Sequence, residues 1–281
     1  MGKIMDIIKL MRVGQWYKNI LVFTPVVFAH FLFLPDKLII ALCAFFAFCA
    51  VSSCTYIIND IVDIKNDSLH PTKKNRPLPS GKITKRFAIL LAILLGIITI
   101  ILCSALPFVV SIIILGYFIL NLMYSFYLKH LFIIDVMVIG ISFILRVLAG
   151  SESVDVHLSS WLFIATFVLA LLLGFSKRSN ELNLNDASSH RKVLMKYDPI
   201  ILRSFILISA ITALIVYLIY TIIVIDEQYF ILTTPFVFYG LFLFLSFTIH
   251  DGIDPDNIFK NIAFDLNLIL WMIVVVFSLY A

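Results

Sequence analysis

The segment from Asn59 to Asp67 gathers four side chains with oxygen donors: Asn59, Asp60, Asp63 and Asp67. On a helix, with about 100° between successive residues, these four positions fall within roughly one quadrant. Carboxylates so close together repel one another unless positive charge lies among them. Hard oxygen ligands suit Mg²⁺, which keeps several waters and usually joins one or two carboxylates to substrate phosphates. The segment is therefore a candidate site for Mg²⁺ and a diphosphate.

A basic loop follows the acidic segment and brings three cations, Lys73, Lys74 and Arg76. Lysine and arginine are the usual partners of phosphate oxygens. The prolines and Gly81 around them favour a loop of defined shape over a random basic run. Such a loop can cover phosphates and exclude water. The alternative is that these cations only mark the cytoplasmic side of a membrane protein.

The composition identifies a protein with many membrane spans. Hydrophobic residues make up 62% of the 281 residues, and 14% are charged, where soluble domains have about a quarter. Nine apolar stretches are near the ~20 residues that cross a bilayer, approximately 19–35, 38–58, 87–106, 108–127, 131–150, 160–176, 202–225, 229–250 and 262–280. Backbone groups find no water in lipid, so all nine are expected to be helices. We therefore predict an all-α integral membrane protein, with Pro25, Pro107 and Pro235 at helix ends or kinks.

Positive charge is distributed unevenly between the two sides of the expected membrane topology. All Lys and Arg residues except Lys37 and Arg146 fall at the N-terminus or in and beside the connections on one side. The positive-inside rule places that side in the cytoplasm. Only two internal connections, 59–86 and 177–201, are long and polar enough to build an active site, and both are on it. The net charge of +4 reflects this topology, and no nucleic-acid motif accompanies it.

Residues 1–18 place polar side chains at three-residue spacing among apolar ones, without a cleavage pattern. We expect an amphipathic helix in the membrane interface rather than a signal peptide. The four cysteines lie in apolar spans without metal-ligand spacing and are expected to be small core residues.

The second polar connection repeats the spacing of the first with mostly different charges. Its corresponding positions are Lys177, Arg178, Glu181 and Asn185. Two isolated charges in the spans, Asp135 and Arg146, are eleven residues apart on one helix and too distant to pair directly. We expect Arg146 to have a structural or cavity-lining role, with acceptor binding as the alternative.

Together, these motifs resemble those of the UbiA superfamily of membrane prenyltransferases. The resemblance rests on nine expected spans, on Asn59-Asp60-x-x-Asp63-x-x-x-Asp67 and on Lys74-Asn75-Arg76-Pro77-x-x-x-Gly81, and it covers essentially the whole chain. It implies one domain, 1–281, of nine transmembrane helices around a central cavity. It also implies that Asp60, Asp63 and Asp67 hold Mg²⁺ and diphosphate, assisted by Asn59. The family's second Asp-rich motif is missing, and Lys177-Arg178-Ser179-Asn180-Glu181 stands in its place.

That replacement, with Gln15-Trp16-Tyr17-Lys18-Asn19 before the first span, is similar to one branch, the decaprenyl-phosphate phosphoribosyltransferases. The branch transfers phosphoribose from phosphoribosyl diphosphate to a polyprenyl phosphate. The donor's 5-phosphate and the acceptor's phosphate would explain why cations stand where the family has carboxylates. The substrate-binding residues that this implies are Lys18, Lys73, Lys74, Arg76, Tyr124, Lys129, Lys177, Arg178, Glu181, His190 and Arg191.

Two other functions remain open from the sequence. A prenyltransferase that moves an isoprenoid from its diphosphate to an aromatic or other acceptor would use the same acidic motif. A transporter of anionic metabolites would explain the spans and the charged cavity, but it does not require three carboxylates beside Lys74-Asn75-Arg76. We expect the cell membrane of a bacterium or archaeon, and the sequence leaves a homo-oligomer open.

Overall fold

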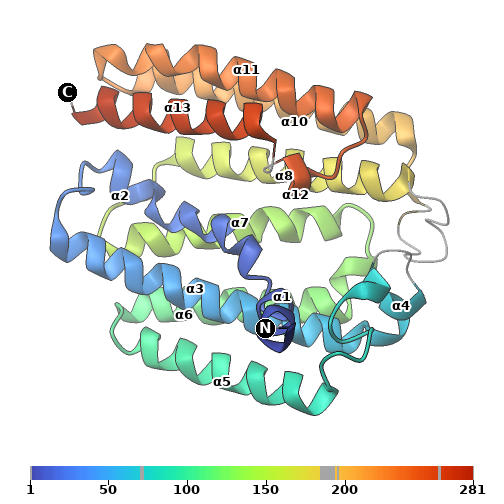
Figure 1. The fold of residues 1–281 in the computed structure, drawn as a ribbon. Coiled ribbons are helices and arrows are strands. Elements are labelled where there is room, and N and C mark those ends of the chain that lie inside the picture. The colour runs from blue at the N-terminus through green and yellow to red at the C-terminus, as the bar shows by residue number, and fades with distance from the viewer. Residues whose placement is uncertain (1, 70–72, 184–193, 195, 259–260, 281) are drawn as a thin grey trace. The chain divides into compact units, whose positions relative to one another are not determined.

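The computed structural model describes residues 2–69, 73–183, 194, 196–258 and 261–280 (Figure 1). The described residues form helices joined by short turns and contain no strand. Eight of these helices are long and apolar enough to cross a membrane. The chain divides into two compact units, Met1–Leu158 and Ser159–Ala281, and each is described by itself. The expected all-α membrane fold is confirmed.

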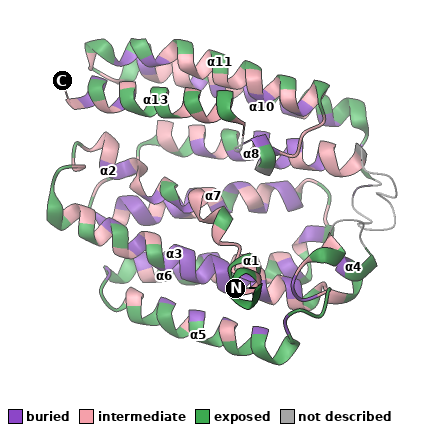
Figure 2. Ribbon diagram, viewed as in Figure 1, coloured by how far each residue is buried: buried purple, intermediate pink, exposed green. Residues whose placement is uncertain are grey.

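The first unit is built around two buried helices. Its elements are α1 (Gly2–Leu10), η1 (Val13–Phe23), α2 (Thr24–Phe28), α3 (Pro35–Val62), α4 (Ile64–Leu69), η2 (Lys73–Asn75), α5 (Lys85–Cys103), α6 (Phe108–Phe126), η3 (Leu128–His130) and α7 (Ile134–Ser153). Helix α3 packs against η1, α5, α6 and α7. Figure 2 shows much of α7 and of the later part of α3 buried, while α5 has an exposed outer face. A helix inside the bundle is thus apolar all round, and its few polar side chains need partners within the unit.

The segment that was expected to be the first span, 19–35, differs from a single long helix. The 3-10 helix η1 covers eleven residues and runs into the five residues of α2. At about 2.0 Å and about 1.5 Å per residue, the two together extend roughly 30 Å, the thickness of the hydrocarbon core. The expected first span is therefore divided between η1 and α2, and it is not among the eight helices that are long and apolar enough to cross a membrane.

The expected amphipathic helix over 1–18 ends at Leu10. Arg12 has φ 51° and ψ 44°, the left-handed conformation, which ends the helical path of α1 before η1 begins. Exposed Ile4, Met5 and Ile8 lie on α1, while Leu10 is fully buried against the unit. The N-terminal segment is therefore a short surface helix followed by a sharp turn.

The second unit consists of α8 (Ser160–Asn183), α10 (Pro199–Ile219), η5 (Tyr220–Val224), η6 (Gln228–Thr233), α11 (Thr234–Leu245), η7 (Ser246–His250), α12 (Pro255–Ile258) and α13 (Ile262–Tyr280). Helix α10 starts sharply because the Asp198 side chain accepts hydrogen bonds from the backbone N–H groups of Ile200 and Ile201. Helix α8 packs against α10, and α11 packs against α13.

The expected proline positions are confirmed, because each of the three lies at the start of a helix. Pro25 and Pro235 occupy the first turns of α2 and α11, and Pro107 precedes α6. There the missing N–H costs no hydrogen bond. The four cysteines are free thiols in buried or half-buried positions, as expected.

Candidate active site

The acidic segment crosses the end of α3 instead of lying on one continuous helix. Asn59 and Asp60 occupy the last turn of α3, Asp63 is the residue after its end, and Asp67 lies on α4. The helical hydrogen-bond pattern continues across the break, because the N–H of Asp63 donates to Asn59 and the N–H of Asp67 to Asp63, at 2.9 and 2.8 Å. The expected helical spacing is therefore kept, although the expected single helix is divided at Asp63.

Asp60 is the most enclosed of the three carboxylates, with 2% of its surface exposed. Its Oδ1 accepts hydrogen bonds from Arg12 at 2.5 Å and from Arg76 at 3.2 Å. The Arg12 guanidinium also lies 4.8 Å from the centre of the Tyr56 ring. Two cations from distant parts of the sequence thus stabilise one buried negative charge.

Arg76 joins two carboxylates of the segment. Besides Asp60, its Nη1 donates to Oδ2 of Asp67 at 2.7 Å. Burial raises the pKa of Asp67 above its ordinary value, and the positive charges of Arg76 and Lys73 act in the opposite direction. Asp67, which composition alone could have left as a solvated helix end, is in fact 5% exposed and ion-paired.

Asp63 has a different cationic partner, Lys129. The lysine Nζ donates to both carboxylate oxygens, at 2.6 and 2.8 Å. Lys129 lies on η3 at the end of α6 and is 8% exposed. Half-buried Tyr124 precedes it on α6. The three carboxylates are thus balanced by Arg12, Arg76 and Lys129, and all six residues belong to the first unit.

The donor set fits Mg²⁺ together with a phosphate ligand. The Oδ1 atom of Asn59 is buried and has no hydrogen-bond partner, which is a costly state for an amide oxygen. With the nearby carboxylates, it offers the hard oxygen ligands that this ion prefers. Among the described residues, no three His, Cys, Asp or Glu side chains are close enough to share one ion directly. Magnesium at phosphates typically takes one or two carboxylates, so one shared shell of three is not required.

The basic loop after α4 has a defined shape, as its prolines and glycine predicted. Gly81 has φ 73°, and the N–H of Ile83 donates to the carbonyl of Pro77 at 3.0 Å. Leu78 and Ile83 are each 5% exposed and pack into the apolar core against α3 and α5. Of the remaining cations, Lys73 is half-buried and contributes to the field at Asp67, whereas Lys74 is exposed.

Lys18 is half-buried on η1, and its Nζ lies 5.7 Å from the ring centre of Tyr17. In the second unit, Arg178 is 1% exposed and forms an ion pair with Glu181 one turn later on α8. Lys177 beside it is half-buried. The predicted residues His190 and Arg191, and Asn185 of the repeated spacing, lie outside the described residues.

Arg12 is the site residue that the sequence did not single out. It looked like one of several cations on an amphipathic N-terminal helix. Only the left-handed turn at this residue brings its guanidinium to Asp60, 48 positions away. The pattern of polar spacing carries no signal for such a turn at an arginine.

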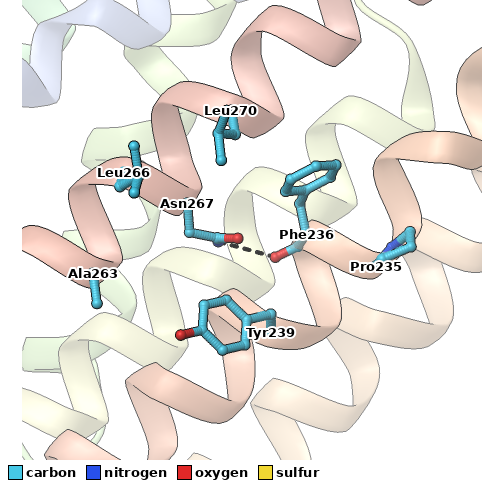
Figure 3. A pocket seen from close by; sticks show the side chains of 7 residues that line it. All are labelled: Pro235, Phe236, Tyr239, Ala263, Leu266, Asn267 and Leu270. Carbon is cyan, nitrogen blue, oxygen red and sulfur yellow. Dashed lines mark hydrogen bonds between the residues drawn. The ribbon is translucent and has the colours of Figure 1, made fainter.

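A separate pocket lies between α11 and α13 of the second unit, with a volume of about 380 Å³ (Figure 3). Its seven lining residues are mostly apolar, namely Pro235, Phe236, Tyr239, Ala263, Leu266, Asn267 and Leu270. The one amide, Asn267, donates to the carbonyl oxygen of Phe236 at 3.0 Å. This lining offers no cation or carboxylate for phosphate chemistry.

Comparisons with known proteins show which family the chain belongs to. The profile of the UbiA prenyltransferase family matches residues 21–273. The chain is 32% identical over 219 residues to a decaprenyl-phosphate phosphoribosyltransferase of Mycolicibacterium smegmatis, covering 75% of this chain and 68% of that protein. The protein of the same name from Corynebacterium glutamicum is 32% identical over 218 residues, covering 74% and 64%.

Among solved structures, the fold is similar to that of a UbiA homolog from Archaeoglobus fulgidus bound to GPP and Mg²⁺. The TM-score is 0.76 at 17% sequence identity, covering 98% of this chain and 100% of that chain. At this identity the likeness concerns the fold. The family profile extends over most of the chain, and this chain therefore belongs to the UbiA prenyltransferase family of membrane-embedded enzymes.

Proposed function

We propose that this protein transfers 5-phosphoribose from phosphoribosyl diphosphate to a polyprenyl phosphate, with Mg²⁺, at the cytoplasmic face of the membrane. The observation that carries the proposal is the 32% identity to the two decaprenyl-phosphate phosphoribosyltransferases over three quarters of the chain. The charged site in the first unit supports it, because the site combines acidic metal ligands with cations that suit phosphate.

In this proposal the donor's diphosphate binds beside the acidic segment. One or two of the carboxylates of Asp60, Asp63 and Asp67 would hold Mg²⁺ directly, and Asn59 would add its unpartnered amide oxygen. The ion supplies positive charge that neutralises the departing diphosphate. Arg12, Arg76 and Lys129 are already within hydrogen-bond distance of the carboxylates, so they can share their remaining N–H groups with phosphate oxygens.

The other phosphates of the two substrates are assigned to the second polar connection. We infer that Lys177, Arg178, His190 and Arg191 bind the donor's 5-phosphate or the acceptor phosphate, with Glu181 accepting from ribose hydroxyls. These assignments rest on residue type. The Arg178–Glu181 ion pair supports them in one respect, because a buried guanidinium that is already oriented loses little freedom on binding a phosphate.

The reaction needs charge neutralisation more than proton transfer. A phosphate oxygen of the lipid attacks the ribose carbon that carries the diphosphate. The new carbon–oxygen bond forms as the old one breaks, and diphosphate leaves with the bonding electrons. The attacking oxygen is already anionic at neutral pH, so no general base is required. Positioning and electrostatic stabilisation by the cations are expected to dominate the rate enhancement.

The test is a transfer assay with the purified full-length chain. Radiolabelled phosphoribosyl diphosphate and Mg²⁺ are incubated with polyprenyl phosphates of several lengths, and the lipid fraction is extracted and counted. Parallel reactions contain labelled prenyl diphosphates with aromatic acceptors. Label in the lipid from the phosphoribosyl donor alone supports the proposal. Transfer only from prenyl diphosphates contradicts it in favour of the prenyltransferase alternative. Donor uptake into proteoliposomes without its consumption identifies a transporter.

A further inference from the structure

Arg146 is a cation in the middle of α7 whose hydrogen bonds end on uncharged groups. It is 3% exposed. Its Nε donates to Oδ1 of Asn19 at 2.7 Å, its Nη1 to the carbonyl of Ser142 at 2.6 Å, and its Nη2 to the hydroxyl of Tyr117 at 2.9 Å. The guanidinium also lies over the Tyr117 ring, 4.9 Å from its centre. A charge held at such a depth is costly, which points to a functional reason for keeping it.

The bond to Asn19 connects Arg146 to the segment that leads into the active site. Asn19 lies on η1 and is 1% exposed. Its Nδ2 donates to Sγ of Cys49 at 3.3 Å and to Oγ of Ser52 at 3.4 Å, both on α3. One amide thus joins η1 to α7 and to α3 at the same point.

A second contact fixes η1 one turn further along α7. A Cβ atom at Gly150 would lie 2.0 Å from the carbonyl oxygen of Val22, so only glycine lets the two backbones approach this closely. Arg146 and Gly150 are four residues apart and share a face of α7. Asn19 and Val22 are three apart and share a face of the 3-10 helix η1. Two matched contacts on these faces fix where η1 lies along α7.

The same face of η1 continues to the active site. Trp16, one further 3-10 turn back, donates its indole N–H to Oγ of Ser53 at 3.0 Å, and Ser53 donates to the carbonyl of Met11 at 2.8 Å. The next residue, Arg12, reaches Asp60 at 2.5 Å. A shift of η1 along α7 would therefore carry Arg12 away from the carboxylate.

We propose that Arg146 and Gly150 are positioning residues: through Asn19 and Val22 they fix η1 against α7 and so hold the Arg12 guanidinium on Asp60. The catalytic consequence rests on the proposed function, in which Asp60 serves the donor diphosphate. The structural link between α7 and Arg12 does not depend on it.

The test starts from four single variants of the purified full-length chain and measures binding of inorganic pyrophosphate with Mg²⁺ by calorimetry. Arg12→Gln removes the final contact, Gly150→Ala forces η1 from α7, and Asn19→Ala breaks the link without adding atoms. Gly96→Ala on α5 is the matched control, because a Cβ there meets nothing within 4 Å. Each protein is first checked for folding by its thermal transition.

We expect Arg12→Gln to weaken pyrophosphate binding about tenfold to a hundredfold, the loss of one charge-assisted phosphate contact. Asn19→Ala and Gly150→Ala should weaken it by several-fold to about tenfold, and Gly96→Ala should match the wild type. Each double variant with Arg12→Gln should bind no more weakly than Arg12→Gln alone, since both changes remove the same contact. The inference is overturned if the affinity losses of the single variants multiply in the double variants. It is also overturned if a folded Asn19→Ala protein binds pyrophosphate as tightly as the wild type.

Two controls separate this inference from the proposed function. If the wild type binds no pyrophosphate, the assigned role of Asp60 fails. The single and double variants are then compared by their unfolding temperatures without ligand. Non-additive shifts then support the link from α7 to Arg12, and additive shifts overturn it. Arg146→Lys keeps the charge without the three-way bonding and should resemble Asn19→Ala. If Arg146→Lys raises only the KM for the lipid phosphate, Arg146 acts on the acceptor and the inference is wrong.

Discussion

The two charged segments with the same residue spacing obtain their ion pairs in different ways. In the first unit, Asp60, Asp63 and Asp67 pair with cations that lie 9 to 66 positions away in the sequence. In the second unit, Arg178 pairs with Glu181 three residues later on the same helix. A site assembled from distant segments requires the whole unit to fold, whereas an i, i+3 pair needs only one helix.

This difference shows what each segment is suited for. The acidic segment has a cation on every carboxylate, so its charges are balanced and its cations can be shared with an arriving anion. The α8 pair presents one buried guanidinium held by one carboxylate. We therefore expect the first segment to control the leaving diphosphate and the second to contribute to donor affinity, and variants of the two segments should behave differently.

The largest effect is expected from Asp60→Asn and Asp63→Asn. Each removes a charged ligand with little change in volume and leaves a cation without its partner. Transfer of phosphoribose should fall by about a hundredfold or more at saturating donor. Initial rates are measured over a range of Mg²⁺ concentrations, with the unfolding temperature as a check of folding.

Asp36→Asn is the matched control for this pair, because Asp36 is exposed in the first turn of the same helix α3. Its rate should equal that of the wild type. A folded Asp60→Asn or Asp63→Asn protein with a near wild-type rate at saturating Mg²⁺ would remove that residue from the metal site.

A smaller effect, confined to the donor, is expected in the second segment. Arg178→Ala should raise the KM for phosphoribosyl diphosphate about tenfold to a hundredfold, with little change in the KM for the lipid phosphate. Glu181→Gln tests the comparison directly: if Glu181 only orients Arg178, its effect on the donor KM should be the smaller of the two. Equal losses for both substrates would mean that the segment supports the fold instead of a phosphate.

Substitutions in the basic loop should have the smallest effect on catalysis, and the effect should differ between Lys73 and Lys74. Lys73 is half-buried and influences Asp67, while Lys74 is exposed to solvent. An exposed charge is screened and contributes little. We expect Lys73→Ala to raise the donor KM several-fold and Lys74→Ala by no more than about twofold. If Lys74→Ala has the larger effect in steady-state assays, the loop must bind the donor in a different arrangement.

Much of the fold could be predicted from the sequence, since lipid allows few alternatives to helices and the helix-starting prolines are informative. The carboxylates of the site were also identifiable, because Asp60 and its neighbours directly follow an apolar span. Which cation pairs with which carboxylate could not be predicted. Arg12 reaches Asp60 only through its left-handed turn, and the helix break at Asp63 keeps its hydrogen-bond pattern without leaving a glycine or proline to mark it. Periodicity records which face a residue is on, but not which distant segment meets that face.

The final prediction concerns the side of the membrane on which the two segments lie, and it requires no change in activity. Both segments are proposed to act on one pool of donor, and the distribution of positive charge places 59–86 and 177–201 in the cytoplasm. Single cysteines at Ser80 and Ser189, with the four native cysteines replaced, should react with an impermeant thiol reagent only after the cytoplasmic side is opened. A cysteine at the exposed position His157, between α7 and α8, should react in intact cells. Labelling of Ser80→Cys and Ser189→Cys from opposite sides would mean that the acidic segment and the second connection cannot serve the same donor molecule. In that case the assignment of Lys177 and Arg178 to the 5-phosphate fails, whatever the rates of the Asp60 and Asp63 variants.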